Sequence, residues 1–230
     1  MSNNYAYVAL LDVLSYKNKL QADNNSAKED FKNSLMSALS PTLNSINQSI
    51  FNIRAISDTI IISCNSHDKI EEFIKILARI FIDFLKQKLF IRGGVSYGRH
   101  FYNNNLTYSN AIVTAHELEN QQAVYPRILI DKNIIEMHAV GNAFQTKIIG
   151  RDYFAKQNGK YFINIIKFID SWDELYYLAK ETYLSDKAEL DRSESAFSKH
   201  QWFENYLFSQ SKFDPSCTVA GRYIEKCEFI

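Results

Sequence analysis

Apolar residues follow two spacings along this chain, and each spacing predicts a different kind of element. In residues 70–89 they recur every three or four positions, which predicts a helix with one buried face. The residues of this stripe are Phe73, Ile74, Leu77, Ile80, Phe81, Phe84 and Leu85. So regular a stripe predicts packing in a core and not a cofactor surface.

Continuous apolar runs form the second pattern. Residues 7–16, 53–64 and 90–98 are rich in Val, Ile and aromatic residues, which predicts strands buried on both faces. The polar pair Ser57 and Asp58 interrupts the middle run, and this predicts a β-hairpin. Helices are expected at residues 15–40 and 110–122, and a further strand at residues 127–131. The first helix should break at residues 23–26 and stop at Ser40 and Pro41. This order predicts an α+β fold with a split βαβ sheet.

The texture of the sequence changes near residue 151. Asn158 and Gly159 lie between two aromatic-rich runs and indicate another hairpin. Residues 171–190, with Ser171 as candidate N-cap, and residues 195–209 are expected to be helices. We therefore expect a core in residues 1–150 and a C-terminal extension in residues 151–230 that packs on it.

Composition narrows the class of protein. The chain has 230 residues, 46% of them hydrophobic, and a formal net charge of zero. A neutral chain does not carry the basic footprint of a nucleic-acid-binding protein. The three cysteines show neither a disulfide framework nor a metal-binding spacing. No secretory leader is visible, and no apolar run reaches the roughly 20 residues of a membrane span. We therefore expect a soluble cytoplasmic protein without a membrane partner.

Two carboxylates carry the candidate chemistry. Asp12 ends the first apolar run, where an unpaired charge is costly. On that run alone, a helix N-cap is the favoured interpretation of Asp12, and a metal ligand is the alternative. Asp58 could serve only the local hydrogen bonds of its turn. Carboxylates at the ends of neighbouring strands can, however, hold one or two Mg²⁺ or Mn²⁺ ions that act on phosphorus.

A third stretch completes a recognisable pattern. The sequence Asp-Val-Leu-Ser-Tyr from Asp12, the Ser-Asp turn and the Arg-Gly-Gly of Arg92 occur in the order and spacing of class III nucleotidyl cyclases. Further matches lie at residues 115–119, 125–128, 158–162 and 199–202. Together they resemble the bacterial pyrimidine cyclases of Pycsar anti-phage defence, over nearly the whole chain.

This resemblance implies a class III cyclase-like sheet with helices, related to ferredoxin and polymerase-palm folds, and a family-specific extension. It implies conversion of UTP to 3′,5′-cyclic UMP and diphosphate, a second messenger that a separate effector reads in abortive infection. CTP as substrate, or a catalytically weak nucleotide-binding module, are the alternatives. Two Mn²⁺ or Mg²⁺ ions per site would be held by Asp12, Asp58 and the backbone carbonyl of Val13.

The resemblance also implies substrate contacts. The backbone N–H groups of Leu14, Ser15 and Tyr16 would cradle phosphate oxygens at the start of a helix, although the Tyr16 ring could simply pack in the core. Arg54 would read the carbonyl edge of uracil, with an acid-paired surface arginine as the alternative, and Ser57 would lie beside the substrate. A head-to-tail homodimer would close each site.

One departure from the cyclase pattern stands out. Val113 and Glu117 occupy the places of the usual transition-state Asn and Arg, and neither can supply the same charge. Arg92 or Arg99 could substitute as the phosphate or transition-state cation. Leu106 replaces the aspartate of purine-cyclase base recognition, which argues against ATP.

Several residues have a structural interpretation. We expect Gly93 and Gly94 to relieve packing against the helix at residues 70–89, with close approach of a ligand or another chain as the alternative. We expect Arg127 to form an ion pair with Glu119, with a phosphate contact as the alternative. The histidines at positions 100, 116, 138 and 200 show no metal-ligand spacing. A palm-type polymerase should show a basic face, and a diguanylate cyclase should carry a Gly-Gly-acid-acid turn where this chain has Ser57 and Asp58.

Overall fold

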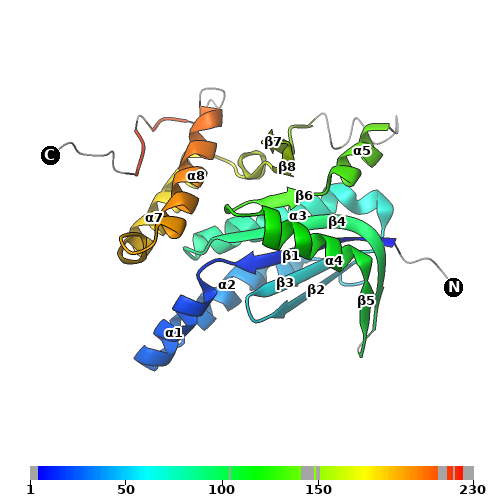
Figure 1. Cartoon of the computed structure of the whole chain (residues 1–230), viewed down its shortest axis with the longest axis horizontal. Helices are drawn as coiled ribbons and strands as arrows, with labels where there is room; N and C mark the ends of the chain where they lie inside the picture. Colours follow the sequence, from blue (N-terminus) through cyan, green and yellow to red (C-terminus); the bar gives the residue numbers. More distant parts are fainter. Residues whose placement is uncertain are drawn as a thin grey trace.

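Strand β1 (Tyr5–Val13) lies near the middle of one mixed sheet, between β3 (Thr59–Cys64) and β4 (Ile91–Tyr102) (Figure 1). The structure, a computed structural model, describes residues 5–103, 105–140, 148, 151–211, 217–219 and 221–224. Both neighbours run antiparallel to β1. The described strands follow the order β2-β3-β1-β4-β6-β8-β7, and β5 pairs with β4. The predicted α+β fold class is confirmed.

The remaining strands are short, and two hairpins join four of them. β2 (Phe51–Ile56) and β3 form the hairpin predicted around Ser57 and Asp58. β7 (Phe154–Gln157) and β8 (Lys160–Ile163) form the one predicted at Asn158 and Gly159, both of which have positive φ. Such paired positive φ values match the twist of a two-residue hairpin turn. β6 (Ile128–Ile130) pairs with β4 in parallel, and β5 (Thr107–Ser109) pairs antiparallel with the C-terminal end of β4.

Strand β1 separates two apolar layers because its side chains alternate between the faces of the sheet. One set joins the large core: Tyr7, Ala9, Leu11 and Val13. Helix α3 (Ile70–Lys86) buries its whole predicted stripe in this core, and α2 (Asp30–Ser45) packs beside it. On the other face, α4 (Asn110–Glu117) covers β1 and β4 and forms a small cluster with Ala6 and Val8. Asp12 shares this α4 face by alternation.

Four helical details differ from the sequence prediction. α1 (Tyr16–Ser26) and α2 are separate helices, as predicted, but the break lies at residues 27–29, and the predicted break at residues 23–26 falls inside α1. α2 continues through Pro41 to Ser45. Pro41 is exposed, so the carbonyl that loses its helical partner can face water, which removes part of the penalty. α4 passes into a π-helical turn at Leu118–Gln122. α5 (Lys132–Val140) was not predicted.

The C-terminal part of the chain continues the sheet and adds two long helices. β8 hydrogen-bonds to β6, after which a short 3-10 turn (Ile165–Phe168) leads into α7 (Trp172–Leu190) and α8 (Glu194–Gln210). α7 contacts both α8 and α3, and Figure 1 shows α7 and α8 side by side beyond the end of the sheet. The predicted boundary at residue 150 lies outside the described residues, so the division into core and extension stays a prediction.

Candidate active site

Two acidic side chains meet where β1 ends. Asp12 is paired through its Cα with Thr59, the residue that follows Asp58 in the hairpin turn. The backbone N–H of Val13 donates to the carbonyl of Asp58 over 3.0 Å. Strand pairing therefore brings together the two carboxylates that are 46 positions apart in sequence, 58 less 12. Both side chains are half-buried.

Arg92 on β4 holds the Asp12 carboxylate from the other side. Its Nε donates to Asp12 Oδ2 over 2.9 Å, and its Nη2 lies 2.8 Å from Glu119 Oε1. Its Nη1 also donates to the Ala123 carbonyl over 3.3 Å. The contact with Glu119 is an ion pair that lacks hydrogen-bond geometry, since Glu119 Oε1 has no hydrogen-bond partner among the described residues. Arg92 is thus committed to protein acceptors.

The charges at this end of the sheet do not balance. Burial raises the pKa of Asp12 despite the hydrogen bond and charge of Arg92, and the nearby charge of Asp58 adds to the increase. Burial also raises the pKa of Glu119, against the lowering effect of Arg92. Arg92 and the more distant Lys199 therefore face a group of three acids, whose mutual repulsion a divalent cation would relieve.

The donor set fits a hard cation that shares its coordination with a ligand. Within the described residues, no group of three or more His, Cys, Asp or Glu side chains could hold a metal ion by itself. Mg²⁺ and related ions commonly take one or two carboxylates and complete their shell with phosphate oxygens and water. Asp12, Asp58 and the carbonyl of Val13 offer such a set.

The backbone that follows β1 is only partly available to a phosphate. The N–H of Leu14 donates to the carbonyl of Phe90 over 2.9 Å, so it is not free to cradle an anion. Ser15 has a φ of 60° and caps α1 without a side-chain hydrogen bond to the helix. The first helical bond runs from Lys19 N–H to the Ser15 carbonyl, which leaves the N–H groups of the preceding turn, beginning at Tyr16, without helical acceptors. The Tyr16 ring packs edge-on against Phe31, as its structural interpretation predicts.

Arg54 lies on the same face of the sheet as Asp12 but does not touch it. Its guanidinium sits 3.5 Å from the centre of the Tyr102 ring. Both residues line a cavity of about 480 Å³ between β2, the β4–β5 hairpin and α4, whose wall also includes Asn52, Ser63 and His100. Cation–π stacking fixes the orientation of the arginine.

The other predicted residues fall at different distances from the carboxylates. Ser57 occupies the hairpin turn beside Asp58 and is exposed. Arg99 pairs with Tyr5 at the opposite end of β1, seven residues along β4 from Arg92, or roughly 23 Å in an extended strand. Val113 and Glu117 both lie on the exposed face of α4, and Leu106 is exposed as well.

Two structural predictions from the sequence are wrong. Arg127 does not pair with Glu119, because Arg92 does; Arg127 lies among the Tyr125, Phe162 and Trp202 rings and donates to Gln157.

Gly93 and Gly94 were predicted to make room for the helix at residues 70–89, which is α3, and this is wrong. A Cβ on Gly94 would lie 2.4 Å from the Ala115 carbonyl and 2.6 Å from Leu118 Cβ, so this glycine admits α4 and not α3. A Cβ on Gly93 would meet Leu11 and the Leu10 carbonyl of β1.

Residues to which the sequence assigned no role at the site complete it. Glu119 stands in the π-helical turn, a distortion that no spacing rule revealed. Glu189 of α7 and Lys199 of α8 come close because the C-terminal helices dock at the end of β1. Lys199 belongs to one of the matched motifs, which located it but suggested no role.

No protein-family model matches the chain, and no curated protein matches it. Among solved structures, the chain is similar to the guanylyl cyclase Cya2, with a TM-score of 0.44 and 10% identity over 69% of this chain and 90% of that one. It is also similar to the guanylate cyclase domain of RhGC from Catenaria anguillulae in complex with GTP (TM-score 0.44, 12% identity, 70% and 97% covered). A bacterial light-regulated adenylyl cyclase gives a TM-score of 0.42, 15% identity and coverage of 77% and 97%.

None of the helices in the described part of the chain combines the length and the apolar character that a bilayer span requires.

Proposed function

We propose that this protein is a pyrimidine nucleotide cyclase that converts UTP to 3′,5′-cyclic UMP and diphosphate. The observation that carries the proposal is the meeting of Asp12 and Asp58 at the ends of paired strands, next to the start of α1. The ordered motifs that resemble class III cyclases add to it. CTP is the second substrate in order of preference, and the cyclic product would serve a separate effector in anti-phage defence in the cytoplasm.

The chain's own residues would act on the substrate by position and charge. The carboxylates of Asp12 and Asp58, with the Val13 carbonyl, would hold two Mn²⁺ or Mg²⁺ ions; when bound, such ions lower the pKa of the 3′-hydroxyl and offset charge on the phosphates. The N–H groups at the start of α1, from Ser15 and Tyr16, would orient phosphate oxygens. Arg92 would keep Asp12 and Glu119 in place and would not itself touch phosphate.

The preference for UTP rests on Arg54. Its guanidinium carries five donors and no acceptor, which match the carbonyl edge of uracil and clash with the amino group of cytosine or adenine. Its stacking on Tyr102 in a largely apolar cavity supports a role in binding a planar base. A site built on buried donors rejects a mismatched base strongly, because its donors then stay unpaired.

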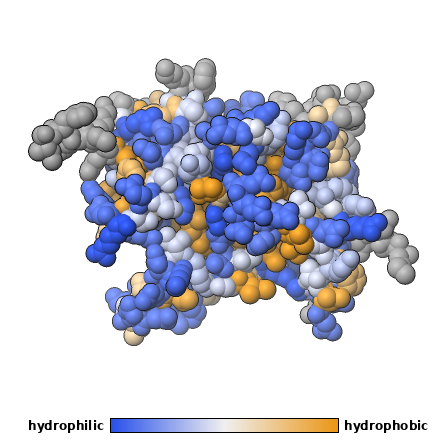
Figure 2. Space-filling model, in the orientation of Figure 1, coloured by the Kyte–Doolittle hydropathy of each residue, from blue (hydrophilic) through white to orange (hydrophobic). Residues whose placement is uncertain are grey.

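A head-to-tail homodimer is part of the proposal. Large apolar side chains are exposed around the cavity that contains Arg54; they are Ile56, Leu106, Tyr108 and Val113. Figure 2 shows orange apolar groups at several places on this face, between polar ones. A second copy would cover them and could complete the base pocket from the other side, giving two equivalent sites. A catalytically active monomer in light scattering would contradict this arrangement.

A second function is favoured by one feature of the site. Val113 and Glu117 replace the usual polar pair on α4, and Arg92 is engaged by Asp12 and Glu119. A protein that binds nucleotide with little or no turnover would show the same pattern.

Product analysis separates these functions. Purified protein is incubated with Mn²⁺ and each of the four ribonucleoside triphosphates, and the cyclic nucleotides are identified by mass. We expect cyclic UMP to dominate. Dominant cyclic CMP would overturn the UTP assignment, and nucleotide binding without any cyclic product would favour the binding module.

A further inference from the structure

Lys199 of α8 is a cation within electrostatic reach of the Asp12 carboxylate. It is half-buried, and its charge lowers the pKa of Asp12. Burial, and then the charge of Arg92, lower the pKa of Lys199 itself, whereas Asp12 and Glu189 raise it. Lys199 lines a small crevice together with Leu14, which directly follows β1, and Glu189 of α7.

Lys199 differs from the other cations near Asp12 in what it contacts. Arg92 is engaged by Asp12 and Glu119, and Lys19 is engaged by Asp186 over 3.0 Å. For Lys199, no acid among the described residues lies within ion-pair distance, and no hydrogen bond holds its ammonium group. A partly desolvated ammonium group without a close counter-ion is costly unless a ligand supplies the negative charge.

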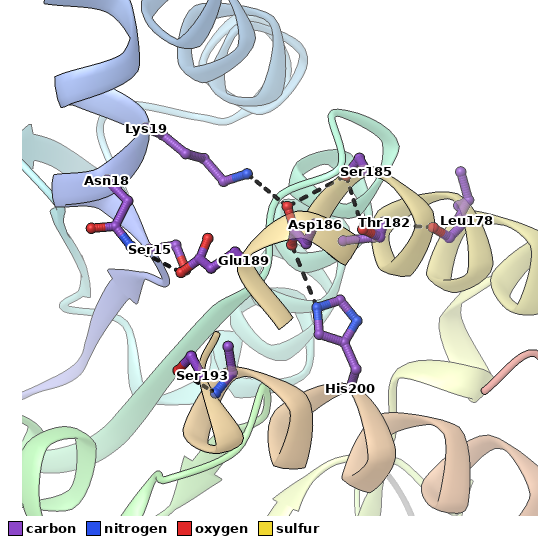
Figure 3. A network of polar contacts seen from close by, with 11 residues as sticks. Ser15, Asn18, Lys19, Leu178, Thr182, Ser185, Asp186, Glu189, Ser193 and His200 are labelled. Carbon is purple, nitrogen blue, oxygen red and sulfur yellow. Dashed lines mark hydrogen bonds and ion pairs between the residues drawn. The ribbon is translucent and has the colours of Figure 1, made fainter. Parts of the chain in front are cut away.

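The position of Lys199 is fixed by its neighbour in the sequence. His200 is buried, and its Nε2 lies 3.4 Å from Asp186 Oδ2. The His200 ring also meets the Phe90 and Tyr183 rings edge-on. Figure 3 shows Asp186 between His200 and Lys19, so one acid joins α7 to both α8 and α1. Lys199 is therefore held beside the candidate site before any ligand binds.

The start of α1 borders the small crevice that Lys199 lines. Ser15 and Glu189 also line this crevice. Ser15 Oγ and Asn18 Nδ2 both donate to Glu189 Oε1, over 3.0 and 2.9 Å (Figure 3). An anionic group is thus already accommodated at the start of this helix, in keeping with the polarity of a helix N-terminus. Lys199 and the N–H groups of this turn that lack helical acceptors present positive charge from two directions.

We propose that Lys199 binds the phosphate oxygens of the nucleoside triphosphate, in the same chain that supplies Asp12 and Asp58. It would provide the positive charge that Val113 and Glu117 cannot give, from an element outside the predicted core. The identification of the ligand as a nucleoside triphosphate rests on the proposed function. The C-terminal extension would then be part of the binding site and not only a cover for the sheet.

Calorimetric binding of UTP and of inorganic pyrophosphate tests this role. Ca²⁺ replaces Mn²⁺ so that affinity is measured without turnover. We expect Lys199→Met to weaken both ligands roughly ten- to a hundredfold, as for loss of a charged hydrogen bond, and Lys199→Arg to recover part of the loss. The matched control is Lys180→Met on α7, which is also half-buried and lies nine residues, or about 13 Å of helix, before Glu189. The control should bind as the wild type does.

The outcomes separate this inference from the proposed function. Unchanged affinities in Lys199→Met, with or without a lower melting temperature, would overturn the phosphate role and leave the cyclase assignment standing. Lost pyrophosphate affinity in Lys199→Met, together with no cyclic product from the wild type, would overturn the cyclase assignment and support the phosphate site. A wild-type protein that binds neither UTP nor pyrophosphate would overturn both.

Discussion

The two ends of β1 treat polar side chains in opposite ways. Near its beginning, Tyr7 hydroxyl lies 2.9 Å from His138 Nε2 and 3.2 Å from His67 Nδ1, and burial lowers the pKa of His138 and raises that of Tyr7. These shifts favour neutral groups that satisfy one another. At the other end, Asp12 and its neighbours carry charge, and acids outnumber the arginine that joins them. The cluster around Tyr7 can be explained by its contribution to stability, whereas the cluster around Asp12 carries excess negative charge that a bound ligand would neutralise.

The largest expected effect comes from removing one carboxylate at the Asp12 end. Asp58→Asn should reduce cyclase activity at least about a hundredfold, since even residues behind a metal ligand cost up to that factor. The melting temperature should stay the same or rise, because repulsion between Asp58 and Asp12 is relieved. Activity is measured by product mass and stability by calorimetry.

Asp68→Asn is the matched control for Asp58→Asn. Asp68 is exposed and lies just beyond the opposite end of β3. It should keep full activity. Full activity in Asp58→Asn with an unchanged melting curve would contradict the metal-binding interpretation.

Substitutions of two glycines on β4 test how closely α4 packs against this strand. Gly94→Ala places a Cβ 2.4 Å from the Ala115 carbonyl, beneath the turn that carries Glu119. We expect a loss of about 1–3 kcal/mol in the free energy of unfolding, as for overpacked cores. Chemical denaturation measures it.

Gly98→Ala is the control for Gly94→Ala on the same strand and face. Its added Cβ would lie 3.5 Å or more from Ala111, which is ordinary contact. We expect a change below about 0.5 kcal/mol. Equal losses in both variants would show that α4 is not seated more tightly at the Asp12 end.

The base-reading role of Arg54 has an intermediate expected effect. Arg54→Ala should lower UTP turnover roughly tenfold relative to CTP, as expected when one charged hydrogen bond is lost. The measurement is the ratio of cyclic UMP to cyclic CMP from an equal mixture of the two substrates. Arg79→Ala, on α3 away from the cavity, is the control. An unchanged ratio in Arg54→Ala would remove the main support for UTP.

The smallest effect concerns the neutral end of β1. Burial lowers the folded-state pKa of His138 below its ordinary 6.5, so the unfolded chain takes up the proton more readily. The resulting stability is present above pH 6.5 and is lost as the pH falls below it. We expect His138→Gln to reduce this acid sensitivity between pH 7.5 and 5.5 by less than about 1 kcal/mol. Burial also lowers the pKa of His100, so part of the sensitivity should remain.

At the Asp12 end of β1, the dependence of stability on pH should have the opposite sign. The pKa of Asp12 and of Glu119 is raised from 3.8 and 4.5, mainly by burial. Their contribution to stability is fully present below those ordinary values and is lost as the pH rises through the folded-state values. Unfolding measurements on Glu119→Gln between pH 4 and 7 check this, and a variant whose stability still falls with rising pH as in the wild type would contradict it.

Local patterns predicted much of the fold. The helix at residues 70–86 follows from its apolar repeat, and both hairpins follow from turn residues that favour tight geometry. Pro41 was misjudged because a proline rule cannot tell whether the lost hydrogen bond faces water. The π-helical turn at Leu118–Gln122 was missed because apolar spacing does not report on such distortions.

The candidate site was predictable only in part, because sequence patterns report on local structure and not on contacts between distant segments. Asp12 and Asp58 end strands that pair, so sequence pattern was enough to place them together. The partners of Arg92 depend on how β1, β4 and the turn after α4 meet, and charge pairing over such distances leaves no local signal. Lys199 lies in the last long helix, and only the docking of α8 brings it near Asp12.

The most direct test of the central claim is an anomalous diffraction measurement on crystals grown with Mn²⁺ and 3′-deoxy-UTP, which lacks the attacking hydroxyl. The account predicts an anomalous peak coordinated by the carboxylates of both Asp12 and Asp58, with the hydrogen bond from Arg92 Nε to Asp12 weakened or displaced. Manganese bound to the nucleotide alone or elsewhere on the protein, with the Arg92–Asp12 pair intact, would contradict the claim that this end of β1 is a metal-dependent nucleotide site.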